Sequence, residues 1–326
     1  MKNILVIGGA GYVGSILIPK LLKKDYRVTC LDLMIYGENV LPLNENLKII
    51  KGDLRNLKLI KSVINDHDCL IHLACISNDP SFELNPELGK SINFDAFEPL
   101  IKICKGSRIN KFIYASSSSV YGIKDEKDVH EEMSLDPITD YSKFKVKCEE
   151  VLNKYNSNDF TTTVIRPATV CGFSPRQRLD VVVNILTNLA FHKKEITIMG
   201  GTQLRPNIHI DDMADAYIKV LNADKKIVSG EIFNVGYENQ SVNEISNIVE
   251  ENTPHKITKK IIKSNDNRSY HISSKKILEK LNFSPKKNIS NAVNDLITSF
   301  QKKIFHDPLN NSDYFNVKKM NEINLK

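Results

Sequence analysis

Residues 2–17 read Lys2-Asn3-Ile4-Leu5-Val6-Ile7-Gly8-Gly9-Ala10-Gly11-Tyr12-Val13-Gly14-Ser15-Ile16-Leu17, and this stretch decides the fold. An apolar run typical of a buried strand comes first, and apolar residues then recur with helical spacing. Glycines at 8, 11 and 14 make a turn between the two elements. Glycines let the backbone bend sharply and let a pyrophosphate approach without meeting a Cβ atom, while the N–H groups of the first helical turn face the phosphates. The stretch predicts a dinucleotide-binding unit; the alternative is a plain strand-to-helix turn.

The next predicted strand, Arg27 to Leu31, ends at Asp32. An acidic residue about 20 residues past the glycines accepts hydrogen bonds from the ribose hydroxyls of the adenosine. Asp32 would repel a 2′-phosphate, and the following Leu33-Met34-Ile35 supplies no cation to hold one. We therefore predict NAD as the cofactor, in preference to NADP.

The composition is that of an ordinary globular protein, with 326 residues of which 41% are apolar and 26% charged. We expect no signal peptide and no membrane span, because a glycine turn interrupts the apolar start and no apolar run approaches roughly 20 residues. The six cysteines are scattered without a CxxC pair, which is typical of small core residues in a reducing cytoplasm. The net charge of +6 forms no basic block, so we expect no nucleic-acid partner.

Further strands are predicted at 47–51, 69–74, 111–115 and 163–167, with helices between them. This alternation predicts an α/β fold with a parallel sheet and right-handed crossovers. Two loops at strand ends are candidate ligand-binding segments. Asp53 could accept a hydrogen bond from an adenine amino group or merely cap the next helix. Residues 75–86 form a long loop with two prolines at the end of a strand, where such sheets bind ligands.

Tyr141 and Lys145 lie four residues apart at the start of a predicted helix and so share one face. A nearby ammonium favours the phenolate and lowers the tyrosine pKa from its ordinary value of about 10, which produces a general base. A serine hydroxyl from the run at 116–119, at the end of the preceding strand, can hydrogen-bond the same substrate oxygen.

These residues together resemble the extended branch of the short-chain dehydrogenase/reductase family, whose members modify nucleotide sugars. The resemblance covers roughly residues 1 to 300 and implies a Rossmann-type doubly wound sheet with a smaller C-terminal substrate-binding α/β lobe. It implies an NAD-binding domain over 1–172 with return segments at about 205–236, a lobe over 173–204 and 237–310, and a polar tail over 311–326 whose last residues are poorly ordered. It also implies Tyr141 as the base, Lys145 on the nicotinamide ribose and Ser117 as the hydroxyl partner. The residues that it places around NAD are Gly8, Gly11, Tyr12, Val13, Gly14, Asp32, Asp53, Leu54, Leu73, Ala74 and, beside the nicotinamide, the strand of Arg166.

The resemblance also assigns a substrate half. Arg205 and Arg268 match the arginines that grip the nucleotide diphosphate, which suits their planar forks, and Asn184 would contact phosphate. Arg176 and Arg178 are extra cations for which a substrate role and a solvated role are both open. Asn78, in the loop at 76–86, is expected to line the sugar pocket. Two departures from the family pattern are Pro206-Asn207 in place of Asp-Tyr and Phe144 in place of a small residue.

The chemistry implied by the resemblance begins with oxidation at sugar C4. A 4,6-dehydratase needs a carboxylic acid and a carboxylate where Ser118 and Ser119 stand, so dehydration is disfavoured. Return of the hydride to the turned-over keto sugar gives 4-epimerisation, which we predict. The alternatives are a 4-dehydrogenase, for instance on a GDP-linked heptose, and a noncatalytic NAD-binding regulator. A homodimer is expected, paired through the helix after Tyr141 and the one around 89–105.

Overall fold

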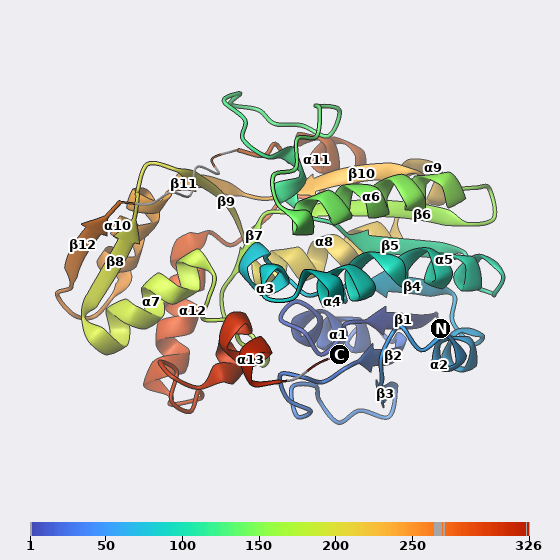
Figure 1. Ribbon diagram of the computed structural model, residues 1–326, viewed down its shortest axis with the longest axis horizontal. Coiled ribbons are helices and arrows are strands. Elements are labelled where there is room, and N and C mark those ends of the chain that lie inside the picture. Colours follow the sequence, from blue (N-terminus) through green and yellow to red (C-terminus); the bar gives the residue numbers. More distant parts are fainter. Residues whose placement is uncertain (1, 264–268, 270, 324, 326) are drawn as a thin grey trace.

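The computed structural model describes residues 2–263, 269, 271–323 and 325, and Figure 1 shows a large sheet with helices on both faces beside a smaller lobe. The large sheet has the order β10-β6-β5-β4-β1-β2-β3, and all its pairings are parallel. The strand order runs outward from β1 in both directions, as in a doubly wound fold. The predicted Rossmann-type sheet is thereby confirmed. Its strands are β1 (Asn3–Ile7), β2 (Arg27–Asp32), β3 (Leu47–Lys51), β4 (Cys69–His72), β5 (Lys111–Ala115), β6 (Thr161–Pro167) and β10 (Glu231–Val235).

Helices cover both faces of this sheet and bury two separate apolar clusters against it. All four residues of the central strand β4 are buried, as expected for a parallel strand covered on both sides. Side-chain caps begin several helices, including Asn56 before α2 and Thr139 before α6. The helices are α1 (Gly14–Leu22), α2 (Leu57–Ile64), α3 (Asp79–Glu83), α4 (Pro86–Lys90), the π-helix η1 (Ser91–Asp95), α5 (Phe97–Lys105), the 3₁₀ turn η2 (Ser118–Tyr121), α6 (Asp140–Tyr155), α8 (Ile210–Asn222), α9 (Lys225–Val228) and α11 (Lys275–Leu281).

The smaller lobe packs around its own apolar cluster, to which α7, α10 and α12 contribute. It holds a two-stranded and a three-stranded sheet, in the orders β12-β8 and β11-β9-β7. Its elements are β7 (Thr169–Cys171), α7 (Val182–Lys193), β8 (Glu195–Met199), β9 (Leu204–His209), β11 (Glu238–Ser241), α10 (Val242–Asn252), β12 (Thr258–Ile262), α12 (Ile289–Gln301), the 3₁₀ turn η3 (Ser312–Tyr314) and α13 (Asn316–Glu322).

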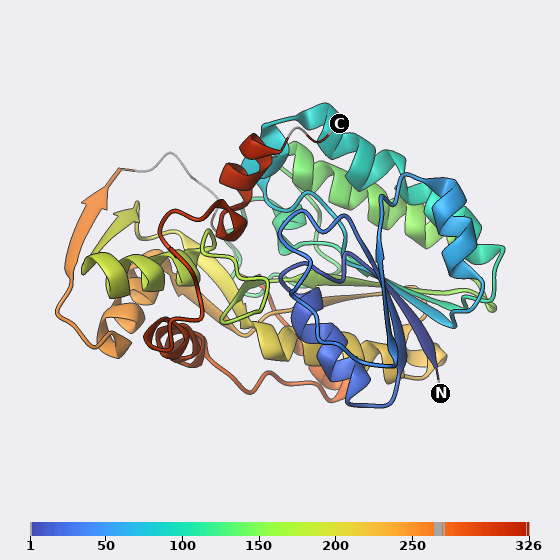
Figure 2. The ribbon, with the colours of Figure 1, turned by 90° about the horizontal axis from the view of Figure 1, so that it is seen from below.

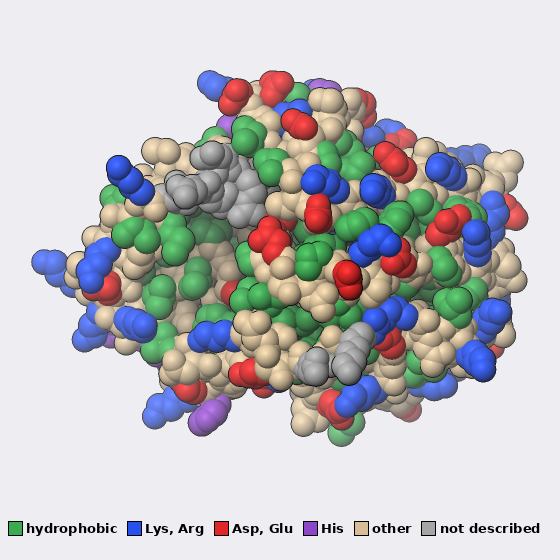
Figure 3. Space-filling view, in the orientation of Figure 1, with side chains coloured by type: hydrophobic (Ala, Val, Ile, Leu, Met, Phe, Trp, Pro, Cys, Tyr) green, Lys and Arg blue, Asp and Glu red, His purple; other side chains and the backbone are tan. Residues whose placement is uncertain are grey.

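Two expected segments differ from the structure. The helix expected around 89–105 is interrupted by η1, where the Asn93 side chain accepts a hydrogen bond from the backbone N–H of Ile76 and donates one to its carbonyl oxygen. The expected polar tail contains α13, which buries Asn316 and Met320. Among the described residues, no helix combines the length and apolarity that crossing a membrane requires. The face seen in Figure 3 carries intermixed positive and negative side chains.

Candidate active site

The three glycines of the first turn are required for different structural reasons. A Cβ on Gly8 would lie 2.4 Å from the Ala74 nitrogen, and one on Gly14 would lie 2.4 Å from the Gly9 carbonyl oxygen. Both positions therefore need glycine for packing, and Gly8 also has a φ of +82°. A Cβ on Gly11 would approach only the Gly8 oxygen, at 3.2 Å, and Gly11 lines the cavity described below. Gly11 thus leaves open the space that a dinucleotide pyrophosphate would occupy.

Asp32 stands at the end of β2 beside this turn. Its two carboxylate oxygens accept hydrogen bonds from the backbone N–H groups of Ala10 (3.0 Å) and Met34 (2.8 Å). Burial raises the pKa of Asp32, and the two N–H donors oppose that rise. The carboxylate is held in one orientation on the wall of the cavity, where it suits a ribose diol.

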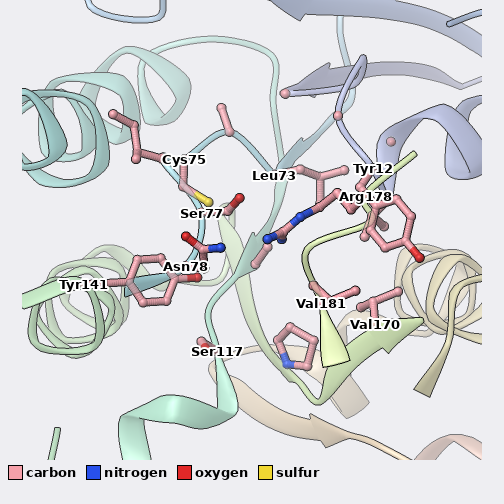
Figure 4. Close-up of a pocket in the computed structure, with 18 of the residues that line it drawn as sticks. Tyr12, Leu73, Cys75, Ser77, Asn78, Ser117, Tyr141, Val170, Arg178 and Val181 are labelled. Atoms are coloured by element: carbon pink, nitrogen blue, oxygen red, sulfur yellow. The ribbon is translucent and has the colours of Figure 1, made fainter. Parts of the chain in front are cut away.

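A cavity of about 490 Å³ runs from the glycine turn to the start of α6, between the large sheet and the smaller lobe. This volume is within the range of cofactor and ligand pockets. Figure 4 shows Tyr141, Asn78 and Ser117 on one side, Tyr12 on the other, and Arg178 extending between them. The predicted residues that line it are Gly8, Gly11, Tyr12, Val13, Gly14, Asp32, Leu54, Leu73, Ala74, Asn78, Ser117, Tyr141, Lys145, Arg176, Arg178 and Arg205.

Ser117, Tyr141 and Lys145 meet at one end of this cavity. All three residues line the cavity, and the Lys145 ammonium lies 5.6 Å from the centre of the Tyr141 ring. Lys145 is buried and donates to the Ala115 carbonyl oxygen at 2.6 Å, which anchors it to the end of β5. Phe144 faces away and packs with Phe82 and Phe94, so the departure from a small residue extends the helix packing.

The pKa of Tyr141 differs from the expectation. Burial raises it well above 10, the Cys75 thiol and the Asp79 carboxyl raise it further, and Arg178 opposes them. The expected lowering by Lys145 is therefore wrong for the ligand-free protein, because removing the phenol from water disfavours the phenolate more than the neighbouring cations favour it. In this state Tyr141 is a phenol that can donate a hydrogen bond.

Arg176 is buried and the Arg178 side chain is only 12% exposed, so the solvated role is excluded for both. Arg178 donates from Nε to Asp180 at 2.9 Å, while its Nη2 has no hydrogen-bond partner among the described residues. Arg178 therefore presents an unpaired N–H edge to the cavity near Tyr141. An anionic or hydroxylated ligand would satisfy it.

Three residues that were predicted to contact the cofactor or the substrate do not line the cavity and bond to other parts of the protein. Asp53 faces Arg55, with 2.6 Å between Oδ2 and Nη2. Arg166 pairs with Glu149 behind the catalytic end, while the next residues of its chain, 167–170, line the cavity. The side-chain amide of Asn184 bonds the Tyr12 hydroxyl and the backbone of residues 172 and 178, so it braces the cavity wall. Arg268 lies outside the described residues.

Sequence reasoning missed several cavity residues. Tyr36 follows Asp32 closely and Asp180 follows the paired arginines, so both could have been sought near the site. Met320 and Leu325 line the cavity from the C-terminal segment, and no motif in that segment marks them.

The fold and site define a class: a dinucleotide-binding α/β enzyme with a Ser–Tyr–Lys set facing its cofactor cavity. The family model described as "NAD dependent epimerase/dehydratase family" matches residues 4–236, and the chain belongs to that family. The predicted family and NAD as cofactor are confirmed.

Named relatives lie on both sides of the epimerase–dehydratase division. The chain is 32% identical over 273 residues to a Bacillus subtilis protein named "Uncharacterized UDP-glucose epimerase YtcB", covering 78% of this chain and 84% of that one. It is 29% identical over 258 residues to a Dictyostelium discoideum dTDP-D-glucose 4,6-dehydratase, covering 72% of this chain and 58% of the relative. Among solved structures, the UDP-glucuronic acid 4-epimerase of Bacillus cereus, in complex with UDP-glucuronic acid and NAD, superposes with a TM-score of 0.82 at 27% identity, covering 93% of this chain and 100% of that one.

Proposed function

We propose that this chain is an NAD-dependent nucleotide-sugar 4-epimerase. One observation carries the proposal: Ser117, Tyr141 and Lys145 line one end of the cavity that begins at the glycine turn, with the Lys145 ammonium 5.6 Å from the centre of the Tyr141 ring. The positions where a 4,6-dehydratase of this family needs an acid and a base hold Ser118 and Ser119. Ser118 is buried, and the Ser119 hydroxyl lies 2.8 Å from that of Ser117. Hydroxyls do not supply the carboxyl chemistry of dehydration, which leaves reversible oxidation.

The protein's part in this reaction is proton transfer and placement. Tyr141 takes the proton of the C4 hydroxyl as the C4–H bond breaks, and Ser117 hydrogen-bonds the same oxygen. Bound NAD would supply the hydride acceptor and donor, and the positive charge of its oxidised ring would lower the pKa of Tyr141 and favour the phenolate that accepts the proton. When the keto sugar presents its other face and C4 is reduced again, Tyr141 would return the proton to the C4 oxygen. Lys145, fixed by Ala115, keeps positive charge beside the phenol through both halves.

The test is incubation with a panel of nucleotide sugars, followed by absorbance for net NADH and by mass spectrometry. An epimerase gives a product of unchanged mass and no NADH. Loss of two hydrogens with NADH would replace the proposal by the 4-dehydrogenase, and loss of water by a dehydratase. Tyr141→Phe should lower turnover by about 10²- to 10⁴-fold while NAD binding changes little. Equal turnover in this variant would exclude Tyr141 as the base, whereas NAD binding without turnover of any sugar by the unmodified protein would favour the noncatalytic regulator.

Residues 76–80 line the cavity next to Tyr141, and we propose that they select the sugar. Asn78 has a φ of +73° and caps α3 by accepting from Ser81 at 3.0 Å. Exposed Asn85 caps α4 in the same way, accepting from Leu88 at 3.0 Å. Asn78→Gly and Asn85→Gly therefore remove the same kind of cap, and Gly tolerates the positive φ. Only Asn78→Gly should change the ranking of substrates in the panel; an unchanged ranking in both would refute this role.

We propose that the anionic groups of the nucleotide sugar are held by Arg178 and Arg205. Arg205 lines the cavity, and the unpaired Nη2 of Arg178 supports its part. Arg178→Met should raise the KM by about tenfold or more, as for loss of a hydrogen bond from a charged group.

We also propose a homodimer acting in the cytoplasm. The support for the dimer is that α5 and α6 lie side by side on one face of the sheet, as the expected four-helix pairing requires (Figure 1). Sedimentation at micromolar concentration should show twice the mass of the chain, and a monomer would contradict the pairing. The six cysteines are all free, and five are buried, which suits a reducing compartment.

A further inference from the structure

The C-terminal segment crosses the mouth of the cofactor cavity. Tyr314 and Phe315 pack with Phe305 in a small apolar cluster of the C-terminal lobe. A few residues later, Met320 and Leu325 join the cluster on the large-sheet side and line the cavity. Figure 2 shows α13 lying between the two halves of the molecule. The segment therefore bridges the lobes across the space where the dinucleotide binds.

Asn316, the first residue of α13, is the fixed point of this crossing. It is 1% exposed, and its side-chain oxygen accepts from Nη2 of Arg176 at 2.6 Å. Its side-chain nitrogen donates to the Ser77 hydroxyl at 2.9 Å, and its backbone N–H donates to Asp180 at 2.8 Å. Two loops of the cavity wall, one between β4 and α3 and one between β7 and α7, thus meet at this residue.

Arg176 lies beside the phosphate-binding turn. Its backbone N–H donates to the Ser15 hydroxyl in the first turn of α1 at 3.4 Å, and its guanidinium lies 3.6 Å from the centre of the Tyr36 ring. The side chain is 3% exposed, and its Nε has no hydrogen-bond partner among the described residues. Arg176 is therefore a buried cation on the cavity wall, with one N–H that no described residue accepts.

Within the part of the chain that the structure describes, Arg176 forms no ion pair of its own. Burial lowers its pKa to about 10, and the nearby carboxylates of Asp32 and Asp180 only partly oppose this. Both carboxylates already accept other bonds: Asp32 from two backbone N–H groups, and Asp180 from Arg178 and Asn316. A buried charge without a partner is costly, so the position calls for an anion. The anion of NAD is its pyrophosphate, which the glycine turn places at the start of α1.

We propose that Arg176 binds the pyrophosphate of the dinucleotide and that α13, through Asn316, holds Arg176 in place and closes the cavity over the cofactor. Because Met320 and Leu325 line the cavity, this segment must move for NAD to enter or leave. Slow exchange of NAD with solvent suits the proposed epimerisation, because a cofactor that takes up and returns its hydride within one turnover does not need to leave. The inference depends on NAD occupying the cavity and is independent of which sugar reacts.

The first test is binding of NAD, ADP and adenosine to Arg176→Met, by competition with NADH fluorescence. NAD and ADP carry the pyrophosphate and should each bind about 10- to 100-fold more weakly, as for loss of a charged hydrogen bond. Adenosine, which lacks phosphate, should bind as it does to the wild type. If the variant bound all three ligands equally more weakly, or bound none of them more weakly, the assignment would be overturned. Should this variant fail to fold, Arg176→Lys, which keeps the charge but loses the fork and the stacking on Tyr36, should show the same selective pattern.

The second test compares two asparagines of α13. Asn316→Ala removes the buried anchor, whereas Asn321→Ala changes an exposed residue of the same helix. NADH release, followed by stopped-flow fluorescence with excess NAD, should be about tenfold faster in Asn316→Ala and unchanged in Asn321→Ala. Equal release from all three proteins would refute the closure. Since no sugar is present, failure here leaves the epimerase proposal standing, and failure of the sugar panel leaves this result standing.

Discussion

The Arg166–Glu149 pair behind the active site makes a quantitative prediction possible. Both side chains are almost fully buried, 2% and 5% exposed, and three hydrogen bonds of 2.6, 3.1 and 3.2 Å join them. Glu149 also bonds the Ser116 hydroxyl, next to Ser117, and Arg166 donates to the Tyr121 hydroxyl at 2.8 Å. The pair therefore ties α6 and β6 to the segment that carries Ser117, the proposed hydroxyl partner of Tyr141.

Arg166→Met should lower the free energy of unfolding by about 3 to 5 kcal/mol, because it leaves the Glu149 carboxylate buried without its cation. The double variant Arg166→Met/Glu149→Leu removes both charges and should recover most of this loss. Lys51→Met, which breaks an exposed ion pair with Glu38, is the control and should cost at most about 1 kcal/mol.

The assay is urea unfolding followed by circular dichroism, with the midpoint compared among the four proteins. Should the single variant not fold, the double variant should still do so. The reasoning is refuted if Arg166→Met costs no more than Lys51→Met, or if the double variant is less stable than the single one. NAD affinity of the double variant should stay near that of the wild type, because the Arg166 side chain faces Glu149.

Three further predictions concern the cofactor end and the base. Gly11→Ala should fold with nearly unchanged stability but bind NAD more weakly, whereas Gly8→Ala should fold poorly, since its Cβ would meet the Ala74 backbone at 2.4 Å; calorimetry and thermal unfolding separate the two effects, and equal damage would contradict the different reasons given for these glycines. Asp32→Ser should lower the ratio of NAD to NADP affinity at least tenfold, measured by titration; an unchanged ratio would remove Asp32 from the ribose site. Without NAD, Tyr141 should remain a phenol up to above pH 10, because burial raises its pKa and the phenolate fraction falls tenfold per pH unit below that value. Ultraviolet difference spectra against Tyr141→Phe check this, and a phenolate near pH 7 would contradict it.

The sequence patterns predicted the parts of the site that sit in short segments. The glycine turn, Asp32 at the end of β2 and the Tyr141–Lys145 pair on α6 are local patterns, and the structure brings all of them to one cavity. Long-range contacts were not predictable in this way. Asn316 reaches Ser77 and Arg176 only because the chain crosses both lobes before α13, and no local pattern signals that path.

The pKa of Tyr141 shows a second limit. Spacing identified a cation near the phenol, but burial in the folded protein outweighs it. The sequence spacing of two residues predicts that their side chains lie close together. How deeply the pair is buried depends on the whole fold, and burial sets the pKa of Tyr141 here. The loop at 75–86 is similar: its position at a strand end was predictable, whereas the short helix α3 and the positive φ of Asn78 were not.

The most direct test of the central claim uses a nucleotide sugar that the panel identifies as substrate, labelled with deuterium at C4. We predict that the 4-epimer keeps deuterium at C4, observed by nuclear magnetic resonance, with no net NADH, because the hydride leaves and returns within one cavity. Epimer that has lost the label to solvent, or label that accumulates in free reduced cofactor, would contradict the account.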